Sequence, residues 1–183
     1  MESIKFDKRQ QYIMKNVILC SSFYNDIDEL SELIANLEYT DTLYGREIEE
    51  FYYIPAELTE MISAVLEKSV EIQPNTGTFR KPNSIIHFDN FYEHAQWTCV
   101  VALEDTVLHL HEHKDGSKSY FDMPKEDDFF INNCMTLDNW TTTMSINIKK
   151  NDYAFVRPWL WKSFEQDKTI QVFIVNSLLE SKE

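Results

Sequence analysis

A histidine and an aspartate lie two residues apart at the end of an apolar segment, residues 85–89 (Ile-Ile-His-Phe-Asp). If this segment is a strand, alternation places His87 and Asp89 on one face and Phe88 on the other. A neutral imidazole and a carboxylate that converge from one strand end can supply two ligands to a hard or borderline divalent metal. Taken alone, the pair more simply fits an Asx turn beside a hydrogen-bonded histidine.

The surrounding motifs favour the metal-site interpretation. In chain order they are Phe79-Arg80, the pair itself, a Trp-led segment at 97–103, a histidine-rich segment at 108–116, an aromatic segment at 148–163 and a closing segment at 167–176. This order resembles the small phage and bacterial members of the iron(II)/2-oxoglutarate dioxygenase superfamily. The resemblance covers roughly residues 76–176. It implies a double-stranded β-helix (a jelly-roll, cupin-like barrel), Fe(II) bound by His87 and Asp89, and 2-oxoglutarate as cofactor.

Two positions depart from the family pattern. Lys162, before Ser163, stands where the family has its third metal ligand, a histidine. Lys168 is the nearest match to the arginine that binds 2-oxoglutarate in the family, and it could pair with a carboxylate only as a point charge. An ammonium has no lone pair, so Lys162 cannot bind iron unless its pKa is strongly lowered. For a site without metal, we expect the Lys162 ammonium to take the metal position and pair with Asp89, because a buried carboxylate needs a positive partner.

Three further histidines, His109, His111 and His113, alternate along the chain and would share one face of a strand. That face could be the barrel interior, since cupin-type barrels use a His-x-His strand, or it could be a solvent-facing row on an edge strand. We expect the solvent-facing row for His111 and His113. His109 stays open as a substitute metal ligand.

Arginines near the candidate site could bind an anionic ligand. Arg80 and Arg157 both fall in segments predicted as strands, and the alternative for each is a salt bridge in an acid-rich chain. Arg80 and Lys168 are the residues that we expect to hold a carboxylate cofactor.

The elements that must position these residues follow from apolar spacing and turn residues. Residues 16–22 read as a strand, and helical spacing predicts helices over 26–37, with Asp26 as N-cap, and 56–70. Beyond them, β-branched and aromatic runs predict strands at 84–89, 97–103, 106–112, 118–122, 143–148, 152–157 and 169–176. The prediction is an α+β chain forming a single domain over 1–183. In it, an N-terminal part (1–75) packs its helices on one sheet of a jelly-roll core (76–176).

Composition limits the partners. The chain has 183 residues with 31 acidic and 17 basic side chains, a net charge of −14 that disfavours nucleic-acid binding. Three widely spaced cysteines favour a reducing compartment. No signal peptide and no eighteen-residue apolar run are visible, so we expect a cytoplasmic protein without a membrane partner.

Two functions compete closely. With two family positions changed, we favour a degenerate member without metal that binds a small molecule or a protein, and a homodimer stays open. The alternative is an active hydroxylase that uses Fe(II), 2-oxoglutarate, His87, Asp89 and a non-standard third ligand. A structural role in a virion is a third hypothesis, for which only the acidic, aromatic-rich composition speaks.

Overall fold

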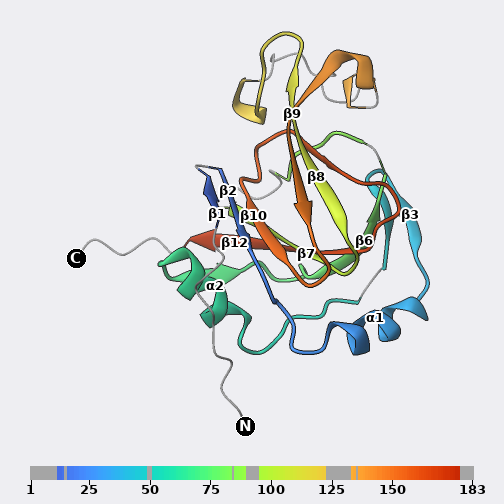
Figure 1. Ribbon diagram of the computed structural model, residues 1–183, viewed down its shortest axis with the longest axis vertical. Coiled ribbons are helices and arrows are strands. Elements are labelled where there is room, and N and C mark those ends of the chain that lie inside the picture. The colour runs from blue at the N-terminus through green and yellow to red at the C-terminus, as the bar shows by residue number, and fades with distance from the viewer. Residues whose placement is uncertain are drawn as a thin grey trace.

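The computed structural model describes residues 12–14, 16–48, 51–83, 85–89, 95–122, 133–134 and 136–177. In these residues the chain is mostly antiparallel β-sheet with two α-helices (Figure 1). None of the described helices is long and apolar enough to cross a membrane.

The strands form two sheets. The larger sheet has the order β1-β2-β10-β7-β12-β6-β4-β3, with β5 paired to β12. Its strands are β1 (Tyr12–Met14), β2 (Val17–Cys20), β3 (Thr40–Thr42), β4 (Gly45–Glu47), β5 (Val70–Ile72), β6 (Thr78–Pro82), β7 (Ala95–Ala102), β10 (Tyr153–Val156) and β12 (Ile170–Ser177). The smaller sheet has the order β11-β8-β9 and consists of β8 (Thr106–His113), β9 (Trp140–Ile148) and β11 (Lys162–Phe164). Short 3-10 turns lie at Tyr120–Asp122 and Leu137–Asn139.

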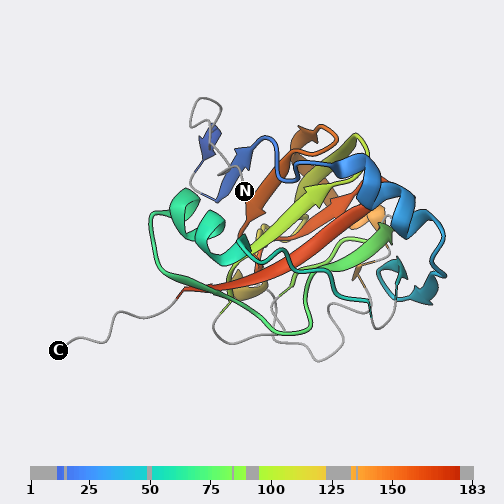
Figure 2. The ribbon, with the colours of Figure 1, turned by 90° about the horizontal axis from the view of Figure 1, so that it is seen from below.

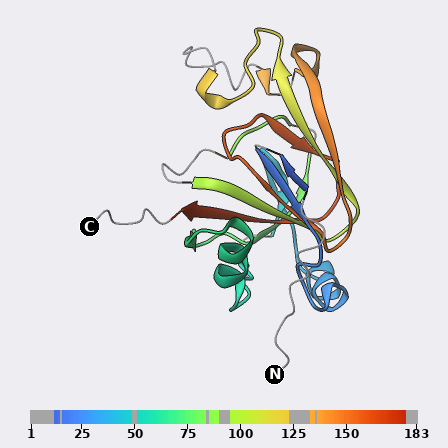
Figure 3. The same cartoon turned by 60° about the vertical axis from the view of Figure 1, so that its left-hand side comes forward.

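The two sheets face each other across a buried core (Figure 3). Val100 and Ala102 of β7 project from the larger sheet into this core, where they meet Leu108 of β8 and Ile148 of β9 from the smaller sheet. Side chains in a strand alternate between faces, so every second residue of β7 points toward the smaller sheet. Thr98 of β7 projects to this same inner side, where it contacts Asp89.

Both helices cover the other face of the larger sheet (Figure 2). α1 (Ile27–Ala35) begins at Asp26, whose carboxylate accepts a hydrogen bond from the backbone N–H of Glu29 at 3.1 Å. α2 (Leu58–Leu66) packs its apolar side chains on Cys99, while α1 packs beside Leu103. The two predicted helices and the predicted cap are confirmed, with shorter helices than expected.

Four of the longer predicted strands are confirmed as β7, β8, β9 and β12, and the shorter β2 and β10 are confirmed as well. Two predicted strands are wrong. Residues 85–89 form only an isolated bridge at His87, and residues 118–122 form a bridge at Ser119 followed by a 3-10 turn. Each segment makes only a few backbone hydrogen bonds, and these do not continue into a regular ladder.

Candidate functional site

His87, Asp89 and Lys162 come together because of one backbone bridge. The His87 N–H donates to the Lys162 carbonyl at 2.8 Å, and the Lys162 N–H donates to the His87 carbonyl at 2.9 Å. Residues directly opposite in such an antiparallel pair project their side chains to the same side. Asp89, two residues beyond His87, projects to that side too, while Phe88 packs against Trp161 on the other side. The predicted convergence of His87 and Asp89 is confirmed.

A buried ion pair occupies the centre of this group. The Lys162 Nζ atom lies 2.7 Å from Oδ2 of Asp89 and donates a second hydrogen bond to the Pro158 carbonyl at 3.1 Å. The Thr98 hydroxyl of β7 donates to the same carboxylate oxygen at 2.9 Å. The Lys162 side chain is fully buried and that of Asp89 is 11% exposed. The expectation that the Lys162 ammonium pairs with Asp89 is confirmed.

The charges of the pair depend on each other. Burial acts to raise the pKa of Asp89, but the Lys162 ammonium outweighs it, with help from His87, and lowers the pKa to about 2. Burial lowers the pKa of Lys162, and the Asp89 carboxylate opposes that change. A 2.7 Å contact between an amine and an ionised carboxylate is that of a charge-assisted hydrogen bond. Asp89 is therefore ionised at neutral pH and Lys162 is its cationic partner.

His87 is held neutral beside this pair. Its ring lies between Tyr44, with centroids 5.0 Å apart, and Phe164, at 6.2 Å. Its Nδ1 is 3.1 Å from the Ile85 carbonyl, and its Nε2 is 3.7 Å from Oδ1 of Asp89. Burial is the main reason why its pKa falls to about 4, although the Asp89 carboxylate acts to raise it. At neutral pH the imidazole therefore carries no charge.

A pocket adjoins this group between the sheets. One part is lined by His87, Asp89, Tyr44 and Arg80, and a neighbouring part, with a volume of about 100 Å³, opens along β6 and β12. Arg80 lines both parts, and its Nε lies 2.8 Å from Oε1 of Glu47. The salt-bridge interpretation of Arg80 is confirmed, and because the residue also lines the pocket, binding of an anion there stays a prediction.

The side chains present do not fit an iron site of the usual kind. His87 and Asp89 offer a nitrogen and oxygens, but the third position holds an ammonium bonded to Asp89. An ammonium offers hydrogen-bond donors only. Within the described residues, no group of three or more His, Cys, Asp or Glu side chains is arranged to hold a metal ion.

Two other predicted anion-binding residues lie elsewhere. Lys168 does not line the pocket beside Asp89. It lies near Glu104, a residue of the turn between β7 and β8. The Arg157 guanidinium lies over the Trp97 ring, 3.7 Å from its centroid, and donates to the Gln96 carbonyl. Of the basic residues considered from sequence, only Arg80 and Lys162 reach the group around Asp89.

His109 lies on the opposite side of the smaller sheet from Asp89. Register pairs His109 with Ser163, and Lys162 with Leu110, so His109 and Lys162 point to opposite faces. The His109 Nδ1 is 2.8 Å from the Ser145 hydroxyl, and its ring lines a separate outer pocket. The structure therefore places His109 away from His87, where it cannot complete that ligand set.

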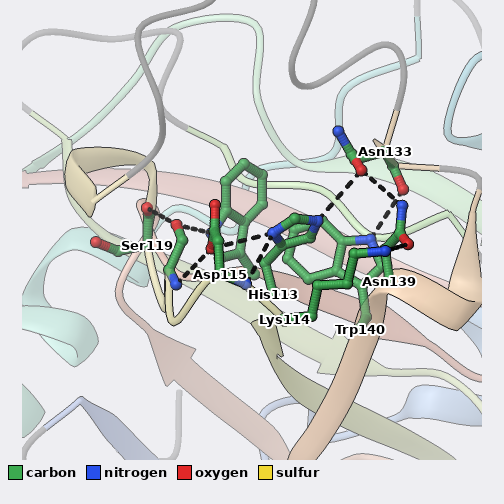
Figure 4. A network of polar contacts seen from close by, with 9 residues as sticks. His113, Lys114, Asp115, Ser119, Asn133, Asn139 and Trp140 are labelled. Atoms are coloured by element: carbon green, nitrogen blue, oxygen red, sulfur yellow. Dashed lines mark hydrogen bonds and ion pairs between the residues drawn. The ribbon is translucent and has the colours of Figure 1, made fainter.

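The prediction of a solvent-facing row on an edge strand is wrong for His111 and His113. β8 is the central strand of its sheet, and both side chains are buried. His111 Nε2 is 2.8 Å from the Ser163 hydroxyl, and burial is the main reason why its pKa falls to about 4. His113 lies between Asp115, at 3.0 Å, and Asn133, at 3.2 Å, in the network of Figure 4.

That network is structural. The Asn133 side chain also accepts a hydrogen bond from Asn139 at 2.7 Å, and its backbone carbonyl accepts one from the Trp140 indole at 2.8 Å (Figure 4). These bonds tie the start of β9 to the end of β8. His113 thus has the polar partners that a buried imidazole needs.

Sequence reasoning did not assign roles to Thr98 or Tyr44. Thr98 carries a usable signal, because a hydroxyl at an inward position of the buried β7 strand requires a polar partner. The sequence around Tyr44 gives no such signal, because Tyr44 lies on the turn between β3 and β4, two strands that were not predicted. Only the pairing of β4 with β6 brings that turn to His87.

Comparison with known protein families finds no match for this chain, and comparison with curated proteins finds no significant match either.

Replacing Lys162 with methionine should destabilise the fold by about 3–5 kcal/mol, because the Asp89 carboxylate would be left buried without its cation. The free energy of unfolding from urea denaturation measures this cost. The double variant Lys162→Met/Asp89→Asn should recover part of it, since it removes both charges together. Additive losses in the two single variants and the double variant would show that the two side chains do not interact.

Acid should weaken the fold between about pH 6.5 and pH 4. Over this range the unfolded chain takes up a proton at His87, whereas the folded protein does not until its pKa of about 4, so folding stability falls as pH falls. The contribution of His87 is up to about 3 kcal/mol, since one pKa unit corresponds to about 1.4 kcal/mol. Asp89, whose folded pKa is lowered, loses its contribution only at still lower pH, below about 4.

Urea denaturation at a series of pH values measures this dependence. His87→Gln should flatten the slope between pH 6.5 and pH 4 without abolishing it, because His111 contributes in the same direction. The exposed Thr143→Ala variant, which removes no titrating group, should keep the wild-type slope. An unchanged slope in His87→Gln would contradict the neutral, buried state of His87.

Proposed function

We propose that this chain is a jelly-roll protein of the iron(II)/2-oxoglutarate oxygenase type in which the Lys162 ammonium replaces the metal, and that it binds a small acid without oxidising it. The observation that carries this proposal is the 2.7 Å contact between the buried Lys162 amine and the Asp89 carboxylate. The jelly-roll part of the proposal rests on the residues that meet at this contact.

Three family positions that are distant in sequence meet in space, and this supports the jelly-roll assignment. His87 and Asp89 come from the segment before β7, and Lys162 opens β11, more than seventy residues later. They meet between two facing antiparallel sheets, the place where such barrels hold their sites. Convergence of these residues is what the sequence resemblance requires.

The replacement of metal by ammonium changes the chemistry of the site. The Lys162 amine hydrogen-bonds Asp89 and the Pro158 carbonyl, so it satisfies the carboxylate that would otherwise bind a cation. An ammonium has no open coordination position for dioxygen or a keto acid. What remains is a group without net charge, in which His87 and Asp89 line the pocket and Lys162 lies fully buried behind Asp89.

The pocket suits a small acid better than a large ligand. Its volume of about 100 Å³ is below the roughly 300–1,000 Å³ of drug-sized sites. Its wall carries one guanidinium, from Arg80, and the hydroxyl groups of Thr76 and Thr78. Because Lys162 neutralises Asp89, the carboxylate of Asp89 does not oppose an anion at Arg80.

A reducing, cytoplasmic location is part of the proposal. Cys20, Cys99 and Cys134 are all buried, and none of the three is in a disulfide. Free buried thiols persist where the surroundings are reducing.

Lys162→His should create metal binding that depends on His87, because it supplies an imidazole as the missing third ligand. Thermal unfolding and isothermal titration with Mn(II) and Fe(II) measure this gain under anaerobic conditions. The wild-type protein should show no His87-dependent metal response, and Lys162→His/His87→Ala should lose the response gained by Lys162→His. His87-dependent metal binding by the wild-type protein, or conversion of 2-oxoglutarate to succinate that His87→Ala abolishes, would overturn the proposal in favour of an active oxygenase.

Arg80→Gln should weaken binding of a small dicarboxylate by about tenfold or more, because a hydrogen bond to a charged group contributes about 1.5–3 kcal/mol. The probes are 2-oxoglutarate and succinate, titrated into the wild-type protein and followed by calorimetry. Arg46→Gln is the matched control, since Arg46 makes an exposed ion pair with Asp167 outside the pocket. The Arg46→Gln protein should bind both probes as tightly as the wild-type protein does. Equal binding by the Arg80→Gln and wild-type proteins would remove Arg80 from the site.

A further inference from the structure

A second pocket lies on the outer face of the smaller sheet, with a volume of about 300 Å³. Two histidines, His109 and His111, line it together, and their ring centroids are 6.2 Å apart. Its other polar lining residues are Glu165, Gln166 and the hydroxyl-bearing Ser163 and Thr142. This pocket is separate from the group around Lys162, because β11 directs Lys162 to one face and Ser163 to the other.

A β-bulge brings the two imidazoles to this pocket. On β9 the register passes from Met144, opposite Leu110, to Thr142, opposite His111, so Thr143 is an extra residue. Bulges of this kind bend a strand locally and change where nearby side chains point, often next to functional sites. Here the bulge lies beside His111, at the position where β8 presents both rings to the outer pocket.

A serine hydroxyl group contacts one nitrogen of each imidazole, and the Thr142 hydroxyl group lies near the second nitrogen of His111. The Ser145 Oγ lies 2.8 Å from Nδ1 of His109, and the Ser163 Oγ lies 2.8 Å from Nε2 of His111. When each of these nitrogens donates its proton to the serine oxygen, the other nitrogen of each ring carries a lone pair. The lone pairs are then on Nε2 of His109 and Nδ1 of His111, the latter 3.4 Å from the Thr142 hydroxyl. Partners that fix the tautomer in this way are typical of metal-binding histidines.

We infer that His109 and His111 form a binding site for a borderline divalent transition ion of the Zn²⁺ class, independent of the Lys162–Asp89 group. Two imidazoles on one face of a strand form a chelating pair, and imidazole is a preferred ligand of Zn²⁺, Cu²⁺ and Ni²⁺. Water completes the coordination sphere, because the protein supplies two nitrogens from within the described residues. The carboxylate of Glu165 at the pocket wall and the net charge of −14 both favour a cation.

Titration of metal-free protein with Zn²⁺ by calorimetry, in a buffer that does not bind metal, tests this site. His109→Asn and His111→Asn should each weaken Zn²⁺ binding at least about tenfold, since even changes to the partners of metal ligands cost 10–100-fold. Imidazole NMR spectra of the wild-type protein give a second readout that does not depend on a variant folding. On addition of Zn²⁺, the signals of His109 and His111 should shift, and those of the other three histidines should not.

His87→Asn is the matched control and should bind Zn²⁺ as tightly as the wild-type protein. Loss of Zn²⁺ binding in His87→Asn would place the metal at the Asp89 group, which would overturn this inference and also the proposal that Lys162 excludes metal there. Wild-type affinity in both His109→Asn and His111→Asn, or shifted NMR signals from other histidines alone, would overturn this inference and leave the Lys162 proposal standing.

Discussion

The buried ion pair between Lys162 and Asp89 is the interaction on which the interior depends. Neither charge is tolerable alone in a site sealed by both sheets, because removing an ion from water costs several kcal/mol that only a close partner repays. Each partner also has a neutral hydrogen-bond partner, Thr98 for the carboxylate and the Pro158 carbonyl for the amine. The pair therefore joins the segment before β7, the β7 strand itself and β11 at one point.

Strand alternation separates two chemical environments that are only one residue apart. Lys162 points between the sheets, where its charge is compensated by Asp89, and Ser163 points outward to His111. In the inner environment the ion pair is buried and His87 and Asp89 line a small pocket, whereas the outer pocket is larger, rich in hydroxyl groups and lined by imidazoles. The short strand β11 contributes a side chain to each face of its sheet. A substitution at position 162 therefore changes the inner environment, and one at position 163 changes the outer pocket.

Long, regular elements were accessible from sequence, and short ones were not. Apolar spacing predicts α1 and α2, and β-branched runs predict β7, β8 and β12. These elements are long enough for a periodic pattern to be recognised, because a period needs several residues. β3, β4, β5 and β11 have three residues each, too few for a period, and their partners in the sheet determine them. Residues 85–89 were predicted as a strand but form a single bridge, to Lys162, because their other backbone hydrogen bonds go to Cys134 and Pro158 rather than along β11.

The sequence predicted that His87 and Asp89 share a face and, through its resemblance to an oxygenase family, that Lys162 would pair with Asp89. The first prediction follows from local alternation, and the second from that resemblance together with the need of a buried carboxylate for a cation. Only the tertiary structure decided that Arg80 reaches the pocket while Lys168 does not, and that His109 faces away from His87. These facts depend on register and on which sheet face a strand presents, and both are determined by pairing between distant segments rather than by the residues themselves.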